Sequence, residues 1–196
     1  MKRLVKTNLV IVVMFTTMLS FANEFSTLTK EKTKKITKVT FENVKRGSML
    51  SIKDHYGLIL FKELIKNSGE YSKGFDLTAL PDGNYYFELD KEVEIKIVPF
   101  EVLSNMVVFD KTKESTINKP FVTFKEGRLL VSKLALENQP LEIKIYDENN
   151  YLIYSEKLKE GQILERIYDV SKVAKGNYKI VMQSDGREFV KRVEIK

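Results

Sequence analysis

Residues 75–85, FDLTALPDGNY, return 93 positions later as residues 168–178, YDVSKVAKGNY. Each stretch runs from an aromatic residue through aspartate, an aliphatic residue and a hydroxyl residue to Gly-Asn-Tyr. This pattern is typical of a strand that passes through a tight corner into a second strand, because glycine reaches backbone angles that other residues avoid. Its recurrence predicts two copies of one module.

The offset of 93 residues extends beyond this motif, since it also places Asp54 on Asp147. Val-Glu-Ile-Lys occurs in both halves as well, at residues 93–96 and 193–196, but there the separation is 100 residues. We interpret the difference as a longer final hairpin in the second half, at which the offset breaks.

Alternation of apolar and polar residues indicates strands. Residues 141–145 (LEIKI) and 93–97 (VEIKI) have the period of two that half-buried strands show. Asp185-Gly186 is a strong signal for a two-residue hairpin. Residues 58–65 could be drawn as a helix but lack helix caps. The sequence therefore predicts an all-β protein.

The predicted architecture is two tandem immunoglobulin-like β-sandwich modules. We place the first at residues 36–110 and the second at residues 120–196, with residues 111–119 as a polar connector. Residues 106–109 either add a strand to the first module or bridge the two modules.

The repeated motif contains six residues that we expect to shape the corner. The two glycines take positive φ. The two tyrosines stand where a tyrosine corner belongs in immunoglobulin-like sandwiches, with the hydroxyl bonded to the backbone upstream. The two aspartates and the nearby hydroxyl residues bond locally. These structural residues are Asp76, Gly83, Tyr85, Asp169, Gly176 and Tyr178.

The N-terminus predicts export. Three basic residues precede an apolar run over residues 9–19, and small residues stand at Ser20 and Ala22. This order is typical of a secretory signal peptide over residues 1–22. An uncleaved anchor is the alternative; in either case the rest of the chain reaches the periplasm, the cell surface or the medium. Residues 23–35 are polar, which predicts a flexible spacer.

Composition disfavours several classes of function. Removing the three basic residues of the leader lowers the net charge from +6 to +3, so no concentrated positive field attracts nucleic acid. The chain contains no cysteine, so its fold rests on packing alone. We expect no stable membrane span once the leader is cleaved.

No catalytic, cofactor or metal site is predicted. His55 is the only histidine and lies in a turn, so neither a histidine-based triad nor a multi-histidine zinc site can form. The oxygen-rich stretches 82–84 and 147–150 could attract calcium, but turn formation explains them. Tyr151 and Tyr154 could offer a sugar platform, although we favour cross-strand packing.

The second copy of the motif resembles the C-terminal sorting modules of cargo proteins of the Bacteroidetes type IX secretion system. Residues 169–178 follow their Asp-Leu-Ser-x-Leu-x-x-Gly-x-Tyr signature with Val170 and Val173 in place of leucine, and the Lys-rich strand 191–196 completes the likeness. The resemblance implies a β-sandwich and export. Such modules normally follow a much larger cargo domain, whereas here another copy of the sandwich precedes.

We therefore predict an exported, non-catalytic binding or structural protein of the cell envelope, whose partner is an envelope or surface protein or a glycan. The alternative is a secretion-linked protein whose C-terminal sandwich is a type IX sorting domain.

Overall fold

The computed structural model describes residues 29–30 and 36–195. The predicted signal peptide lies outside the described residues, as does most of the predicted spacer. Within the spacer range, Thr29–Lys30 form strand β1, which pairs with β2 (Thr37–Val44). The described helices are two three-residue turns, η1 (Leu77–Ala79) and η2 (Lys111–Lys113). In the described part of the chain, no helix is long and apolar enough to cross a membrane.

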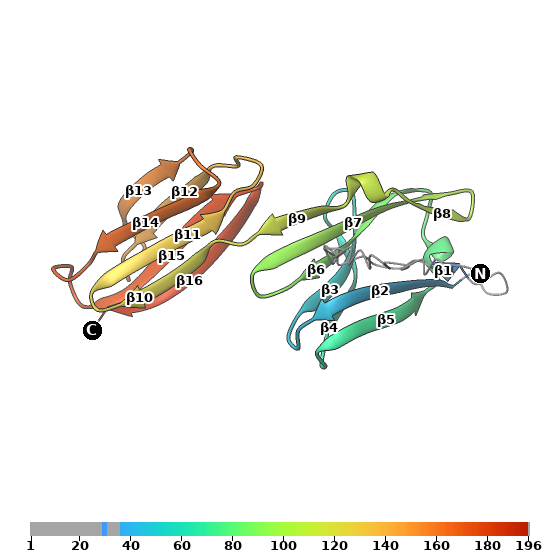
Figure 1. The fold of residues 1–196 in the computed structure, drawn as a ribbon, viewed down its shortest axis with the longest axis horizontal. Coiled ribbons are helices and arrows are strands. Elements are labelled where there is room, and N and C mark those ends of the chain that lie inside the picture. The colour runs from blue at the N-terminus through green and yellow to red at the C-terminus, as the bar shows by residue number, and fades with distance from the viewer. Residues whose placement is uncertain (1–28, 31–35, 196) are drawn as a thin grey trace, which may run out of the picture.

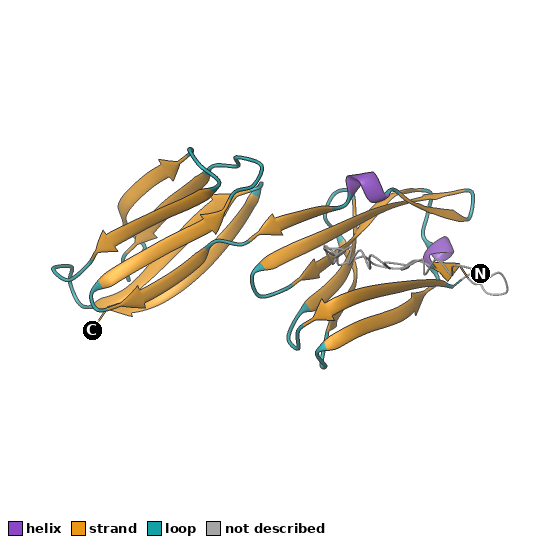
Figure 2. Ribbon diagram, in the orientation of Figure 1, coloured by secondary structure: helices purple, strands orange, loops and turns teal. Residues whose placement is uncertain are grey.

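The chain forms two β-sandwiches joined end to end (Figure 1), and nearly all regular structure is strand (Figure 2). In the first module, one sheet has the order β1-β2-β5 and the other β4-β3-β6-β7-β8, with β9 also paired to β7. Its further strands are β3 (Met49–Asp54), β4 (Ile59–Leu64), β5 (Gly69–Phe75), β6 (Gly83–Asp90), β7 (Glu94–Leu103), β8 (Met106–Phe109) and β9 (Ser115–Asn118).

The second module repeats this plan with the sheet orders β10-β11-β14 and β13-β12-β15-β16. Every strand pair in it is antiparallel. Its strands are β10 (Phe121–Lys125), β11 (Arg128–Leu134), β12 (Leu141–Tyr146), β13 (Leu152–Leu158), β14 (Ile163–Asp169), β15 (Gly176–Ser184) and β16 (Arg187–Ile195). The protein is therefore all-β, with two tandem immunoglobulin-like sandwiches.

Each module buries its own core. The first core is aromatic: Phe87 is fully buried, and its ring lies 5.2 to 6.5 Å from four other phenylalanine rings. The second core is built on aliphatic side chains such as Ile143 and Ile180, both fully buried. Because alternate residues of each strand face inward, the period of two seen in the sequence produces these two cores.

Strand register shows that the predicted break in the repeat is wrong. Gly83 pairs with Val102, and Gly176 pairs with Ile195, so the offset of 93 residues continues through the last strand. Residues 193–196 therefore correspond to residues 100–103 rather than to 93–96. The misleading match arises because β7 and β16 alternate the same few apolar and charged residue types.

Two strands in the first module extend its second sheet. Residues 106–109 form β8, whose Phe109 pairs with Phe100 of β7. The predicted connector contains β9, which pairs with residues 94–97 of β7. Only two residues, Lys119 and Pro120, separate β9 from β10.

Candidate functional site

The two corners have the same geometry. The Tyr85 hydroxyl donates to the Pro81 carbonyl at 2.8 Å, and the Tyr178 hydroxyl donates to the Ala174 carbonyl at 2.7 Å. Both tyrosines are 8% exposed, so each hydrogen bond satisfies a buried phenol.

The glycines and aspartates of the motif also occupy matching places. Gly83 and Gly176 have φ of +159° and +153°, angles that other residues rarely adopt. Asp169 accepts from the backbone N–H of Ser171 at 3.0 Å and from its hydroxyl at 2.6 Å. In the first module, the Asp76 carboxylate accepts from the Thr78 hydroxyl at 2.7 Å. Every hydrogen bond described here is internal to its corner, which favours a structural role for the motif.

A second repeated cluster joins the two sheets of each module at β4 and β5, and at β13 and β14. In the first module, Glu63 pairs with Lys73 and accepts from the Tyr71 hydroxyl. Burial, with the charge of Glu63, raises the pKa of Tyr71 to about 12. The hydrogen bond from Lys73 lowers the pKa of Glu63 despite some burial. The carboxylate stays ionised and the phenol protonated at neutral pH, as suits a structural pair rather than an acid–base pair.

The equivalent cluster in the second module uses Glu156, which accepts from Arg166 at 3.1 Å and from the Tyr168 hydroxyl at 2.5 Å. Burial raises the pKa of Tyr168, and the bond to Glu156 raises it further. Tyr154 packs edge-on against Tyr168 at 5.4 Å. This contact joins β13 to β14 of the opposite sheet, so Tyr154 packs across the sandwich instead of along a strand pair. Tyr151 is 70% exposed in the preceding turn.

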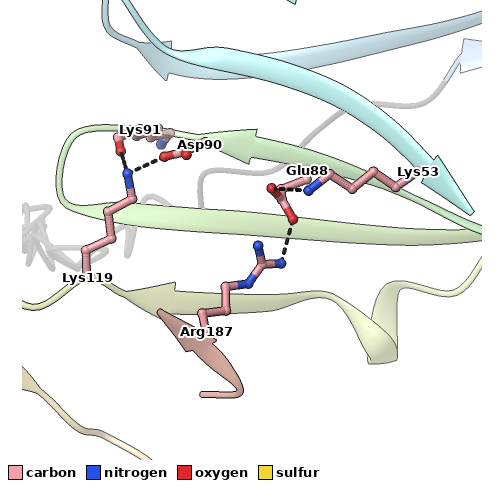
Figure 3. Close-up of polar contacts among 6 residues, drawn as sticks. All are labelled: Lys53, Glu88, Asp90, Lys91, Lys119 and Arg187. Carbon is pink, nitrogen blue, oxygen red and sulfur yellow. Dashed lines mark hydrogen bonds and ion pairs between the residues drawn. The ribbon is translucent and has the colours of Figure 1, made fainter. Parts of the chain in front are cut away.

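The modules meet through charged side chains, as Figure 3 shows. Glu88 of β6 is only 5% exposed and accepts from Lys53 of β3 at 2.8 Å and from Arg187 of β16 at 2.5 Å. Burial raises the pKa of Glu88, but the hydrogen bonds from Arg187 and Lys53 outweigh it, so the net pKa lies below the usual value. Arg187 thus reaches from the second module to a buried carboxylate of the first.

The short link between the modules is also anchored. The Lys119 side chain pairs with Asp90 and donates to the Lys91 carbonyl at 2.6 Å (Figure 3). Its backbone N–H donates to the Val93 carbonyl at 2.9 Å. These bonds fix the chain to the first module just before it enters the second.

Several hollows in the described part of the chain have the volume of a small-ligand site, and two of them bear on function. One is a polar cleft of about 590 Å³ at the junction, between β7 and β9 on one side and the end of β11 on the other. The other is an apolar slot of about 440 Å³ between the sheets of the second module. The slot opens at the end of that module where β15 begins and β16 ends, and its walls include Val173, Tyr178, Ile180 and Val193.

The remaining candidate residues serve turns. His55 is exposed and its ring contacts that of Tyr56, while Asp54 caps the same turn by accepting from two backbone N–H groups. Asp147 caps the equivalent turn in the second module in the same way. Asp82 accepts from the backbone N–H of Ser104. Within residues 29–30 and 36–195, no group of three or more acidic, histidine or cysteine side chains is placed to hold a metal.

The fold and these sites define a class of protein: tandem immunoglobulin-like sandwiches in which the repeated residues support structure. Within that class, residues 126–196 match the family of secretion system C-terminal sorting domains. The match runs from the turn before β11 to the end of the chain and confirms the resemblance predicted from the motif. It favours the alternative prediction, a sorting domain, over the main prediction of an envelope binding or structural protein.

Solved structures to which the chain is similar include a biofilm-associated protein BSP domain, at 12% identity and a TM-score of 0.30 over 82% of this chain and 27% of that one. They also include the chicken interferon gamma receptor alpha chain, at 8% identity and a TM-score of 0.31 over 87% and 96% of the two chains. A third is the FN1-FN3 region of chicken CNTN1, at 10% identity and a TM-score of 0.30 over 83% and 60%. The chain thus spans about a quarter of the first of these structures. No curated protein sequence matches the chain.

The charged junction was not predicted from the sequence, although one signal for it was present. The offset of 93 residues places Glu88 on Val181 and Lys53 on Tyr146. A buried charge in one copy, where the other has an apolar residue, marks a position that the shared fold does not require.

Proposed function

We propose that this chain is an exported, non-catalytic protein whose second module directs it to the type IX secretion machinery. The first module is then the exported part, and it acts at the cell surface or in the medium as a binding or structural domain. The family match over residues 126–196 carries this proposal.

The structure is compatible with different roles for the two modules. In the first, β8 and β9 cover the outer edge of β7. In the second, among described residues, no strand pairs with the outer edge of β16, which is the equivalent strand. An exposed strand edge is a common recognition element. A receptor could therefore pair with β16 of the second module, whereas the equivalent edge of the first module is covered.

The test fuses residues 120–196 behind a signal peptide and an inert reporter, in a host that has type IX machinery. We expect release or surface attachment of the reporter, and loss of both when that machinery is disrupted. A fusion to residues 36–119 is the matched control, because it has the same fold with a covered edge, and it should stay in the periplasm. Periplasmic retention of the first fusion would contradict the sorting role.

We further propose that the leader is cleaved after Ala22. The intact mass of the exported protein should then correspond to a chain that begins at Asn23. A species that retains Met1 would instead indicate an N-terminal anchor.

A further inference from the structure

We propose that the outer edge of β16 and the apolar slot beside it bind an extended peptide strand that inserts an aromatic side chain between the sheets. The proposal goes beyond the sorting role and does not rest on it. It follows from a comparison of equivalent positions in the two modules, one of which already holds such a strand.

The first module shows the occupied form of this site. Strand β8 runs antiparallel to β7, with Phe109 opposite Phe100 and Val107 opposite Val102. Val107 and Phe109 pack against the core, whereas Met106 and Val108 are more than half exposed. Every second side chain of this added strand therefore enters the sandwich.

The ring of Phe109 fills a specific place. It lies 6.5 Å from the ring of Phe87 and 5.4 Å from the ring of Phe100. Strand β8 also contacts η1, the turn of the repeated corner. The added strand thus closes the corner end of the first module.

The second module has the same frame around an open slot. The offset of 93 residues places Phe87 on Ile180 and Phe100 on Val193, and both of these smaller residues line the slot of about 440 Å³. In the described part of the second module, no added strand supplies a counterpart of Phe109. The slot is therefore lined by the counterparts of the two rings that Phe109 contacts in the first module.

The register defines the ligand. A peptide that pairs with β16 in the way that β8 pairs with β7 would run antiparallel to β16. It would place an aromatic residue opposite Val193 and a smaller apolar residue opposite Ile195. The residue after the aromatic one would lie opposite Arg192, which is exposed, so an acidic side chain is favoured there. Backbone hydrogen bonds to the strand edge supply affinity, and the slot supplies selectivity for the aromatic ring.

The chain itself contains a suitable probe, because residues 104–111 (SNMVVFDK) have this pattern. A fluorescent peptide of this sequence is titrated into the chain that begins at residue 23, and anisotropy is measured. We expect saturable binding at one site, and at least a tenfold loss of affinity when the peptide carries F109A.

Two protein variants locate the site. Val173 lines the slot and is 36% exposed, so Val173→Glu places a charge at the mouth and should weaken binding at least tenfold. Val190→Glu makes the same change on β16 at a residue that is 47% exposed and outside the slot, and it should leave affinity within twofold. Thermal unfolding checks that both variants are folded. If Val173→Glu does not fold, Val173→Trp, which fills the slot with an apolar ring, takes its place.

Hydrogen exchange gives an independent measurement, because bound peptide should slow exchange of the backbone amides in residues 193–195 of the unmodified chain. Equal binding of the F109A peptide, or binding that the Val173 variant leaves unchanged, would overturn the proposal. Absence of peptide binding would also overturn it. Concentration-dependent dimerisation that the Val173 variant abolishes, without peptide binding, would assign the edge to a second copy of the chain.

Discussion

The two modules have the same strand register but different edges. In the first, the chain folds back twice, as β8 and β9, to cover the strand that follows the hairpin. In the second, the equivalent strand β16 has an open outer edge among the described residues. Proteins usually cover, charge or shorten such edges, because an exposed edge pairs with other strands. The repeated residues therefore maintain the shared frame, and the two modules differ in function where their sequences diverge.

The two cores also differ in how completely large side chains fill them. The first is filled by stacked phenylalanine rings and the second by smaller aliphatic residues that leave a slot. We expect the largest effect from Phe87→Ala. It should lower the free energy of unfolding of the first module by about 3 to 5 kcal/mol, because a fully buried ring is removed.

Ile180→Ala is the matched change in the second module. Denaturant titration that resolves the two modules should show a separate loss for each variant. If either substitution shifted both transitions equally, the two cores would not be independent.

The tyrosine corners should give a smaller effect that is equal in both modules. Tyr178→Phe and Tyr85→Phe each remove one buried hydroxyl from an equivalent hydrogen bond. Each should destabilise its own module by about 1 to 3 kcal/mol, since the backbone carbonyl loses its partner. Urea titration measures both free energies of unfolding. Values within about 0.5 kcal/mol of the wild type, as surface substitutions usually give, would show that the tyrosine corner does not stabilise the modules.

The junction should contribute less than either corner. Arg187→Ala leaves Glu88 with Lys53 as its described partner, and we expect a loss of about 1 kcal/mol, because Arg187 is partly exposed. Arg192→Ala, on the exposed side of the same strand, is the control. X-ray scattering should show a broader distribution of distances for Arg187→Ala than for Arg192→Ala. Identical scattering from both variants would mean that the short link alone orients the modules.

The smallest effect concerns pH. The pKa of Glu88 is lowered in the folded chain, so its ionised form stabilises the fold above the ordinary pKa of 4.5, and this stabilisation is lost as the pH falls below that value. Wild type should therefore be more stable than Glu88→Gln at pH 7, and the difference should shrink below pH 4.5. Unfolding midpoints over this range measure it; a difference that does not change with pH would indicate that Glu88 acts through packing alone.

Much of the fold could be predicted because local patterns encode it. Alternation along strands such as residues 141–145 follows from one buried and one exposed face. The corner motif predicted matching hydrogen bonds of Tyr85 and Tyr178, since a turn and the tyrosine that closes it lie only four residues apart.

The rest depends on contacts between distant parts of the chain. Residues 115–118 (STIN) contain one strongly apolar residue, so the sequence predicts a connector there. The structure shows that they form β9, in which Ile117 pairs with Ile95. Glu88 reads as an ordinary outward residue of a strand, because its burial comes partly from Arg187, 99 positions away. The slot of the second module was equally hidden, since its walls come from strands of both sheets that are far apart in the sequence.

The short link has a mechanical consequence. Figure 1 shows that the second module begins at the junction with β10 and ends with β16 at the opposite end of the molecule. Tension applied between these two points runs along the strands and loads the backbone hydrogen bonds of β16 with β15 together, in shear, instead of opening them one by one. Nine residue pairs join these two strands. With only two residues between β9 and β10, little slack is taken up first, so a pull on the C-terminal strand is transmitted directly to the first module.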